Sequence, residues 1–307
     1  MINLGSSAIE RMLTWKDHHQ ETPLHIALRK GFSEIANYLI LEGADLNARP
    51  KEGSTLSYLW SSPCSGSREH LLRNMLDHDI SLQGDECLKE FLSSTTIRGD
   101  PGRITMLKIL IDLHGAQING QMHLPLIIAR WKPEDFDYII RTYPKFTARG
   151  AQCVLDCIPR CRSGQWGYWG YYHMDVWEDA NLKTLISHLR SLGFTNADIF
   201  GRDPISGKTP FCAENLTKGI VQTLVAEGGD VNLRDRDNVH PVFYWSKACC
   251  SPYQFENLTQ WWKEVGVELA YTEVVELQEM VMKSAVYSSY KETAEKVKEK
   301  LGGLYVK

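Results

Sequence analysis

One stretch near the N-terminus constrains the fold more than any other. Residues 21–28 read Glu-Thr-Pro-Leu-His-Ile-Ala-Leu and are followed by Gly31. Proline suits the first turn of a helix, where its missing N–H is not required, and the threonine hydroxyl before it can accept a bond from the open amides there. Leu24, Ala27 and Leu28 recur at helical spacing. The sequence therefore predicts a short amphipathic helix that ends at Gly31.

A second short helix is expected directly after the first. Ser33 is a candidate N-cap, and Gly43 is expected to end the helix. The predicted buried stripe of this helix consists of Ile35, Ala36, Leu39 and Ile40. Two helices this short cannot bury their apolar faces alone, whereas stacked copies can. The pattern therefore favours an array of such units.

The unit resembles an ankyrin repeat. The resemblance rests on Thr22-Pro23-Leu24-His25 and on the closing segment Gly43-Ala44-Asp45-Leu46-Asn47. In this family the histidine bonds to the backbone and holds the turn. The resemblance therefore implies a structural role for His25.

Less perfect copies of the unit follow along the chain. The second-best begins at Thr209-Pro210, with Cys212 in place of the histidine, and a later copy places Asn238 where a glycine is usual. Residues 124–129 keep the Pro-Leu pair without a histidine. The predicted second helices include residues 69–76, 106–111, 179–186 and 220–225 and the helix opened by Pro133. We expect an all-α fold, an ankyrin-repeat solenoid of about seven pairs of short antiparallel helices.

Both ends of this array are expected to carry helical caps. Residues 1–16 contain Ser7-Ala8-Ile9-Glu10, a capping-box pattern, and form the predicted N-terminal cap. The repeat array spans residues 17–269, with an aromatic insertion at about 162–178. Residues 270–307 form the predicted C-terminal cap, with one longer helix through Val274 to Val286 and a charged helix over 291–300.

Composition bears on the kind of partner and on the cellular compartment that we expect. The net charge is −4 and charged residues make up 23%, so we expect neither a nucleic-acid partner nor a membrane partner. No run of eighteen apolar residues and no secretory signal is recognisable. Eight cysteines without such a signal indicate reduced thiols. We expect a cytoplasmic or nuclear protein that is not secreted.

The insertion is rich in aromatic side chains among glycines. Its candidate partner-binding residues are Trp166, Tyr168, Trp169, Tyr171 and Tyr172. Three interpretations stay open: a loop that folds its rings onto the array, an aromatic surface for a partner, and a small-molecule or enzyme site with His173 and Asp175.

Cys153, Cys157 and Cys161 are spaced four apart and are followed by His173. Three thiolates and an imidazole can hold zinc in a tetrahedral site, which would give a zinc-stabilised scaffold. The spacing matches no recognised finger, and free cysteines are commonly buried as small apolar groups. Buried core thiols are therefore the main interpretation, and we expect no cofactor.

The resemblance also implies where a partner would dock, namely on the inner helices and the loop tips. The candidate tip residues are Arg49, Lys51, Gln121, Met122, Arg202, Arg234 and Arg236. The alternative is that these are ordinary solvated loop residues. No phosphate loop, nucleophile elbow or His-Glu-x-x-His motif is present. We expect a monomeric, non-enzymatic protein–protein interaction scaffold or adaptor, whose partner is another protein.

Overall fold

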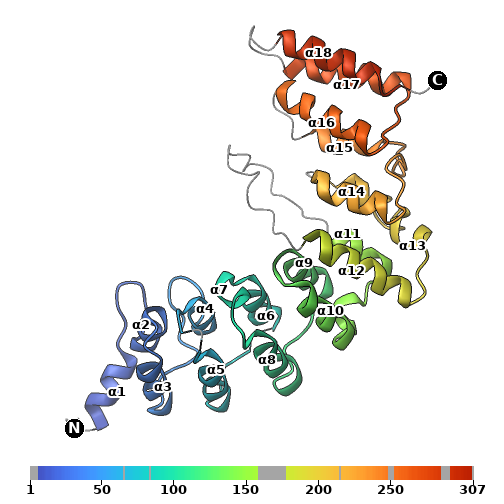
Figure 1. The fold of residues 1–307 in the computed structure, drawn as a ribbon. Helices are drawn as coiled ribbons and strands as arrows, with labels where there is room; N and C mark the ends of the chain where they lie inside the picture. Colours follow the sequence, from blue (N-terminus) through green and yellow to red (C-terminus); the bar gives the residue numbers. More distant parts are fainter. Residues whose placement is uncertain are drawn as a thin grey trace. The chain divides into compact units, whose positions relative to one another are not determined.

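The computed structural model describes residues 6–64, 66–82, 84–157, 178–213, 216–247, 252–284 and 291–305. Regular structure in these ranges is helical, apart from one isolated bridge between Leu269 and Tyr305. The all-α prediction is therefore confirmed for the described chain. Within those ranges, no helix combines the length and apolar character needed to cross a membrane. The chain divides into two compact units, Met1–Trp131 and Lys132–Lys307, which are described separately (Figure 1).

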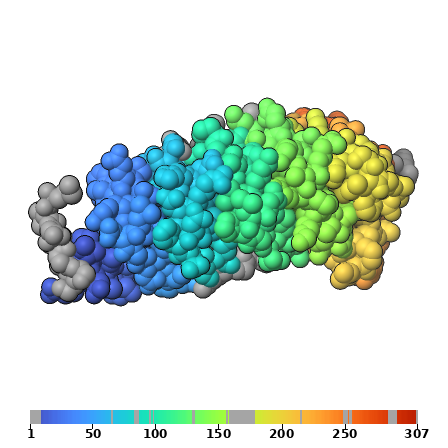
Figure 2. Space-filling view, turned by 90° about the horizontal axis from the view of Figure 1, so that it is seen from below, coloured from blue at the N-terminus to red at the C-terminus, as the bar shows by residue number. Residues whose placement is uncertain are grey.

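Unit 1 consists of short helices joined by loops. Its elements are α1 (Ser6–Thr14), α2 (Pro23–Lys30), α3 (Ser33–Leu41), α4 (Thr55–Ser61), α5 (Arg68–Asp77), α6 (Gly84–Ser93), α7 (Thr95–Arg98), α8 (Arg103–Lys108), a π-helical turn (Ile109–Leu113) and α9 (Gly120–Arg130). Helices α2, α4, α6 and α9 contact one another in sequence, and so do α3, α5 and α8. Unit 1 therefore has two rows of helices, and Figure 2 views it from the side of the α3, α5 and α8 row.

Helix α2, the first of the pair, follows the sequence prediction closely. The Thr22 backbone N–H donates to His25 Nδ1 at 3.1 Å, and the Thr22 hydroxyl lies 2.8 Å from the same nitrogen. Gly31 ends α2 with φ +78°, and a Cβ there would stand 2.7 Å from Pro63 Cγ. A larger residue at position 31 would therefore meet both backbone strain and a steric clash.

Two predictions about α3 are wrong. The residue at the N-cap is Phe32, which has no capping side chain, and Ser33 is already inside the helix. Ile35 is 52% exposed, whereas Ala36, Leu39 and Ile40 are buried. At 100° per residue Ile35 lies roughly 90° from the centre of that buried face. A stripe of three apolar residues is enough to pack α3.

The start of α1 and the start of α9 also differ from expectation. Helix α1 begins at Ser6, so Ser7 does not precede the helix as a cap would. In α9 the cap is Asn119, whose side chain accepts from Met122 N–H at 3.2 Å, and Pro125 lies inside the helix. The fully buried His123 accepts the Asn119 N–H at 3.1 Å. This copy therefore does have a histidine in the role of His25, displaced in sequence.

Unit 2 is also helical, with more irregular turns. Its elements are α10 (Pro133–Thr142), 3-10 turns at Pro144–Thr147 and Gly150–Gln152, α11 (Cys153–Cys157), α12 (Glu178–Ser191), α13 (Asn196–Phe200), a 3-10 turn at Pro210–Cys212, α14 (Lys218–Ala226), α15 (Pro241–Ser246), α16 (Pro252–Glu264), α17 (Tyr271–Ser284) and α18 (Lys291–Gly302). Helix α12 contacts α10, α11 and α14, while α16, α17 and α18 contact one another.

The second-best sequence match forms less helix than predicted. Thr209 to Cys212 makes only a 3-10 turn, because Ala213 is extended, with φ −79° and ψ 137°. Cys212, which stands in place of the histidine, still contacts the threonine before the turn, because its Sγ lies 3.3 Å from Thr209 Oγ1. The predicted left-handed Asn238 is confirmed, with φ +62°.

The C-terminal helices agree partly with prediction. Helix α17 ends at Ser284, and Val286 lies outside the described residues. Helix α18 buries Ala294, Val297 and Leu301 against α16 and α17. The apolar stripe of α18 is therefore packed within unit 2, and the capping role of residues 270–307 stays a prediction.

Candidate functional site

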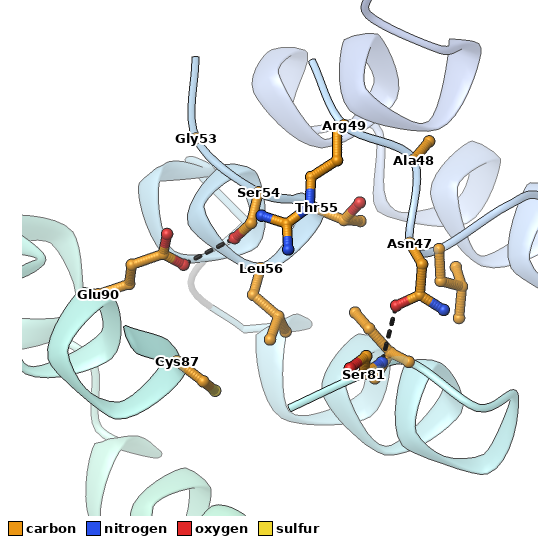
Figure 3. A pocket seen from close by; sticks show the side chains of 12 residues that line it. Asn47, Ala48, Arg49, Gly53, Ser54, Thr55, Leu56, Ser81, Cys87 and Glu90 are labelled. Carbon is orange, nitrogen blue, oxygen red and sulfur yellow. Dashed lines mark hydrogen bonds between the residues drawn. The ribbon is translucent and has the colours of Figure 1, made fainter. Parts of the chain in front are cut away.

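A cleft of about 250 Å³ lies in unit 1 at the junction of the first and second helix pairs (Figure 3). It is lined by Leu46, Asn47, Ala48, Arg49, Gly53, Ser54, Thr55, Leu56, Ile80, Ser81, Cys87 and Glu90. The loop after α3, the start of α4 and helix α6 supply most of these residues. The cleft therefore combines an apolar floor with polar groups on its walls.

One wall is held by Asn47, the last residue of the closing segment. Its Oδ1 accepts the Ser81 N–H at 2.8 Å, and its Nδ2 donates to the Asp79 carbonyl at 3.2 Å. Its own N–H donates to Asp45 Oδ1 at 2.9 Å. The side chain thus connects the loop after α3 to the loop after α5, and this fixes the width of the cleft.

The same bonding pattern recurs in unit 2 at Asn232. Asn232 Oδ1 accepts the Glu268 N–H at 2.8 Å, and Nδ2 donates to the Gly266 carbonyl at 3.0 Å. Its N–H donates to Asp230 Oδ1 at 2.9 Å. Two Asp-x-Asn segments far apart in the sequence therefore make the same set of hydrogen bonds. In each, the asparagine side chain joins its own loop to the next interhelical loop along the chain.

The opposite wall is polar and partly charged. Ser54 Oγ donates to Glu90 Oε2 at 2.7 Å, so α6 is tied to the cap of α4. In Figure 3 the Arg49 guanidinium extends over the cleft beside Ser54 and Thr55. A cation and a carboxylate therefore border one apolar floor.

Cys87 lies at this floor and is 4% exposed. Burial, together with the nearby Glu90 charge, raises the pKa of its thiol to about 12. The thiol therefore stays protonated near neutral pH, and a protonated thiol is a poor nucleophile and a poor metal ligand. The lining residues offer recognition by shape, hydrogen bonds and charge.

Two loop turns beside the helix pairs are bonded to an aspartate side chain. Asp17 Oδ1 accepts the His19 and Glu21 N–H groups, each at 2.8 Å. Asp235 Oδ1 accepts the Asp237 and Val239 N–H groups at 2.9 and 2.8 Å. Burial alone would raise the pKa of Asp235, but the Tyr244 hydroxyl and these amides hold it below its ordinary value. An aspartate at the first position thus fixes each turn.

The predicted tip residues lie in both units. Arg49 lines the cleft, and Lys51 is exposed. Gln121 and Met122 are exposed in the first turn of α9. These four belong to unit 1, and only Arg49 is part of the cleft.

The three predicted arginines of unit 2 all bond within the chain. Arg202 Nε donates to the Arg234 carbonyl at 2.8 Å, and Arg236 donates to the Pro204 carbonyl. Arg234 holds both oxygens of Glu273, at 2.9 and 2.8 Å. This paired geometry gives Arg234 a role in joining its loop to α17.

Two parts of the sequence prediction fall outside the described residues. These are the aromatic candidates Trp166, Tyr168, Trp169, Tyr171 and Tyr172 and the zinc candidates Cys161 and His173. Cys153 and Cys157 are described on α11 and are 1% and 4% exposed. Within the described ranges, no three His, Cys, Asp or Glu side chains cluster as a metal site would require. The zinc hypothesis stays a prediction.

Sequence reasoning missed most of the cleft. The repeated Asp-x-Asn segment was a signal for Asn47, because an asparagine that recurs after an aspartate in two copies indicates a shared bond. Glu90 gave no local signal, since its partner Ser54 lies 36 positions earlier.

Comparison with known proteins gives one match. Residues 19–51 match the family model described as ankyrin repeat. The chain contains an ankyrin repeat. This repeat includes the first helix pair and contributes Leu46 to Arg49 to the cleft. No curated protein and no solved structure matches the chain. An ankyrin repeat is a motif for protein–protein interaction.

Proposed function

We propose that the protein is a non-enzymatic scaffold or adaptor that binds another protein. The observation that carries this proposal is the position of the cleft, which lies where the ankyrin repeat meets the next helix pair. Its floor suits an apolar side chain, while Arg49 and Glu90 can each pair with a charge of the bound segment. The cleft volume of about 250 Å³ fits one or two side chains rather than a whole ligand of drug size.

We further propose that the chain is a solenoid of about seven ankyrin-type units, over residues 17–269, between terminal caps. The shared Asp-x-Asn bonds of the two units and the two aspartate-fixed turns support this. A partner would then contact several loop tips in succession, including Lys51 and Arg202. The aromatic insertion is a second proposed contact surface, and the proposed compartment is the cytoplasm or the nucleus.

The test is affinity purification with mass spectrometry from the native cell. The wild-type chain would be compared with Arg49→Glu, with a deletion of residues 164–176, and with Lys283→Glu as a control on α17 that lies outside the cleft. We expect a defined set of proteins to be retained by wild type and control and reduced by Arg49→Glu. If the three substituted or deleted chains and the wild type all retain the same proteins, neither proposed surface mediates binding. If none retains a protein reproducibly, the scaffold proposal is wrong.

A further inference from the structure

Helix α3 and its N-cap carry a stripe of exposed apolar side chains. Phe32, Ile35, Tyr38 and Leu41 are 54%, 52%, 51% and 58% exposed, respectively. Ile35, Tyr38 and Leu41 follow one another at intervals of three residues, so each lies about 60° around the helix from the one before, and the three together cover an arc of about 120°. Phe32 precedes this face, at the N-cap of the helix. Single exposed apolar residues are ordinary, but a contiguous group marks an interaction surface.

The stripe is not needed to pack α3. Helix α3 contacts α2 and α5 through a different face, where Ala36 and Ile40 are fully buried and Leu39 is 3% exposed. The neighbouring helix α5 belongs to the same row, and its outward residues are polar, including His70, Arg73 and Asp77. The exposed apolar side chains of α3 are therefore bordered on the α5 side by polar residues.

The charged residues of α3 and of its C-cap are acidic, and Lys30, two residues before Phe32, is the nearest basic residue in the sequence. No lysine or arginine occurs between Lys30 and Arg49 in the sequence, whereas Glu34, Glu42 and Asp45 do. Glu34 and Glu42 stand near the two ends of α3, and both are exposed. Arg73 on the adjacent helix is already paired with Glu69 at 3.0 Å. The face thus presents an apolar centre with negative ends.

We propose that this outer face of α3 binds an amphipathic helix of a partner protein, one whose apolar stripe is flanked by lysine or arginine. From Ile35 to Leu41 the stripe spans six residue steps, which at 1.5 Å per residue is about 9 Å, or less than two turns. A helix of similar length can set its own apolar positions along this strip. Basic flanking residues would pair with Glu34 and Glu42 at the ends.

Charge argues against the other occupants. A second copy of the chain docked through the same face would bring acidic ends against acidic ends. A membrane surface commonly carries anionic lipid, and surfaces that bind it carry basic residues around the apolar face. The stripe is also separate from the cleft, because none of its four residues lines the cleft. This inference therefore goes beyond the proposed function and can fail independently of it.

The test uses two fluorescein-labelled peptides of 18 residues with the same leucine stripe, one with lysine flanks and one with glutamate flanks. Anisotropy would be measured with the full chain at near-physiological salt. We expect the lysine peptide to bind and the glutamate peptide to bind at least about tenfold more weakly. The double variant Ile35→Ser/Leu41→Ser should weaken binding of the lysine peptide by about tenfold or more.

Charge reversal and matched controls complete the design. Glu34→Lys/Glu42→Lys should shift preference toward the glutamate peptide. Leu113→Ser and Leu192→Ser replace leucines that are 66% and 55% exposed elsewhere, and they should leave binding unchanged. Arg49→Glu in the cleft should also leave it unchanged. Because all replaced positions on α3 are exposed, circular dichroism and thermal melting should match wild type.

Several outcomes would overturn the proposal. These are failure of both peptides to bind, equal binding by the stripe variant and wild type, or no change in preference after charge reversal. Sedimentation that shows self-association lost in Ile35→Ser/Leu41→Ser would assign the face to a second copy. Stripe-dependent binding to vesicles of phosphatidylcholine and phosphatidylserine would assign it to a membrane.

Discussion

His25 is fully buried and bonds in two directions. Its Nδ1 accepts the Thr22 N–H, so the neutral ring carries its proton on Nε2, which lies 3.0 Å from Thr55 Oγ1. The side chain thus fixes the turn before α2 and also joins that turn to the start of α4. Burial lowers the pKa of His25, which keeps the ring neutral.

Removal of the His25 ring should lower the stability of the protein. His25→Ala leaves the Thr22 N–H and the Thr55 hydroxyl without their partner, and we expect a loss of about 1–3 kcal/mol in unfolding free energy. Urea unfolding followed by circular dichroism measures it. In a double-mutant cycle with Thr55→Val, the two losses should be less than additive. Full additivity would mean that the bond between His25 and Thr55 contributes nothing.

Leu24 and Leu41 give a matched pair within one repeat. Leu24 is 1% exposed on α2, and Leu41 is 58% exposed on α3. Leu24→Ala creates a cavity and should cost about 2–5 kcal/mol, whereas Leu41→Ala should change stability by less than about 0.5 kcal/mol. Thermal and urea unfolding of both variants test the difference. Similar losses at the two positions would contradict the assigned faces of the helices.

At the scale of single residues, the sequence predicted the structure correctly where the local backbone conformation favours one type of residue. The cap at Thr22, the turn at Gly31 and the left-handed Asn238 follow from local chemistry and agree with the structure. Ile35 was assigned to the core because periodicity cannot tell a wide apolar face from two adjacent ones. His123 was missed because its helix begins earlier than the Pro-Leu pair suggested.

Elements within unit 1 are joined by a buried ion pair. Arg68 at the start of α5 and Asp100 before α8 are each 2% exposed, with Nη1 and Oδ2 at 2.5 Å. Arg68 also donates to the Ser62 carbonyl, and Asp100 Oδ1 accepts the Gly102 N–H at 2.8 Å. The pair therefore connects the loop between α4 and α5 to the loop before α8.

Breaking one side of this pair leaves a buried charge without its counter-ion. Arg68→Met or Asp100→Leu alone should each cost about 3–5 kcal/mol, and the double variant should cost less than either single change because no buried charge remains. Urea unfolding of the three variants measures this. A double variant that loses the sum of both single effects would show that the pair carries no special coupling.

At the level of elements, the sequence placed most helices and failed where the backbone left the expected path. The turn at Thr209 has the right residues, yet the chain extends at Ala213 and no α-helix forms. Helix α13 was overlooked, although Thr195 and Asp198 form a capping box that could have predicted it. The cleft depends on a contact between Ser54 and Glu90, which local patterns do not encode.

Acid should destabilise the whole molecule in two separate pH windows. Burial lowers the pKa of His25 and His188, and lowers that of His240 to about 4. Because the unfolded value is about 6.5, the unfolded chain binds more protons, so stability is full above that pH and is lost as pH falls toward 4. Asp203 has a pKa of about 2, held low first by its bond with Ser206, so its contribution is lost only below its unfolded value of 3.8.

The measurement is urea unfolding between pH 7.5 and 4.5. Each buried histidine should add a slope of at most about 1.4 kcal/mol per pH unit in that range. The triple variant His25→Gln/His188→Gln/His240→Gln should begin less stable and show a flatter profile. An equally steep profile in this variant would assign the acid sensitivity to other groups.

Helix α18 offers a test of whether stability depends only on contacts between neighbouring elements. Val297 and Leu301 are fully buried in α18, and this helix contacts α16 and α17. Deletion of residues 291–307 would expose the apolar faces of these two helices. If each element depends on its neighbours alone, amide hydrogen exchange should rise by about tenfold or more in α16 and α17, while α2 to α6 of unit 1 keep wild-type protection. The control is Lys296→Gln/Lys298→Gln, which removes the same net charge as the deletion but keeps the buried side chains of α18. This variant should leave hydrogen exchange unchanged. Uniform loss of protection through both units would instead mean that the chain unfolds as one cooperative block, and stability could not then be divided among neighbouring helix pairs.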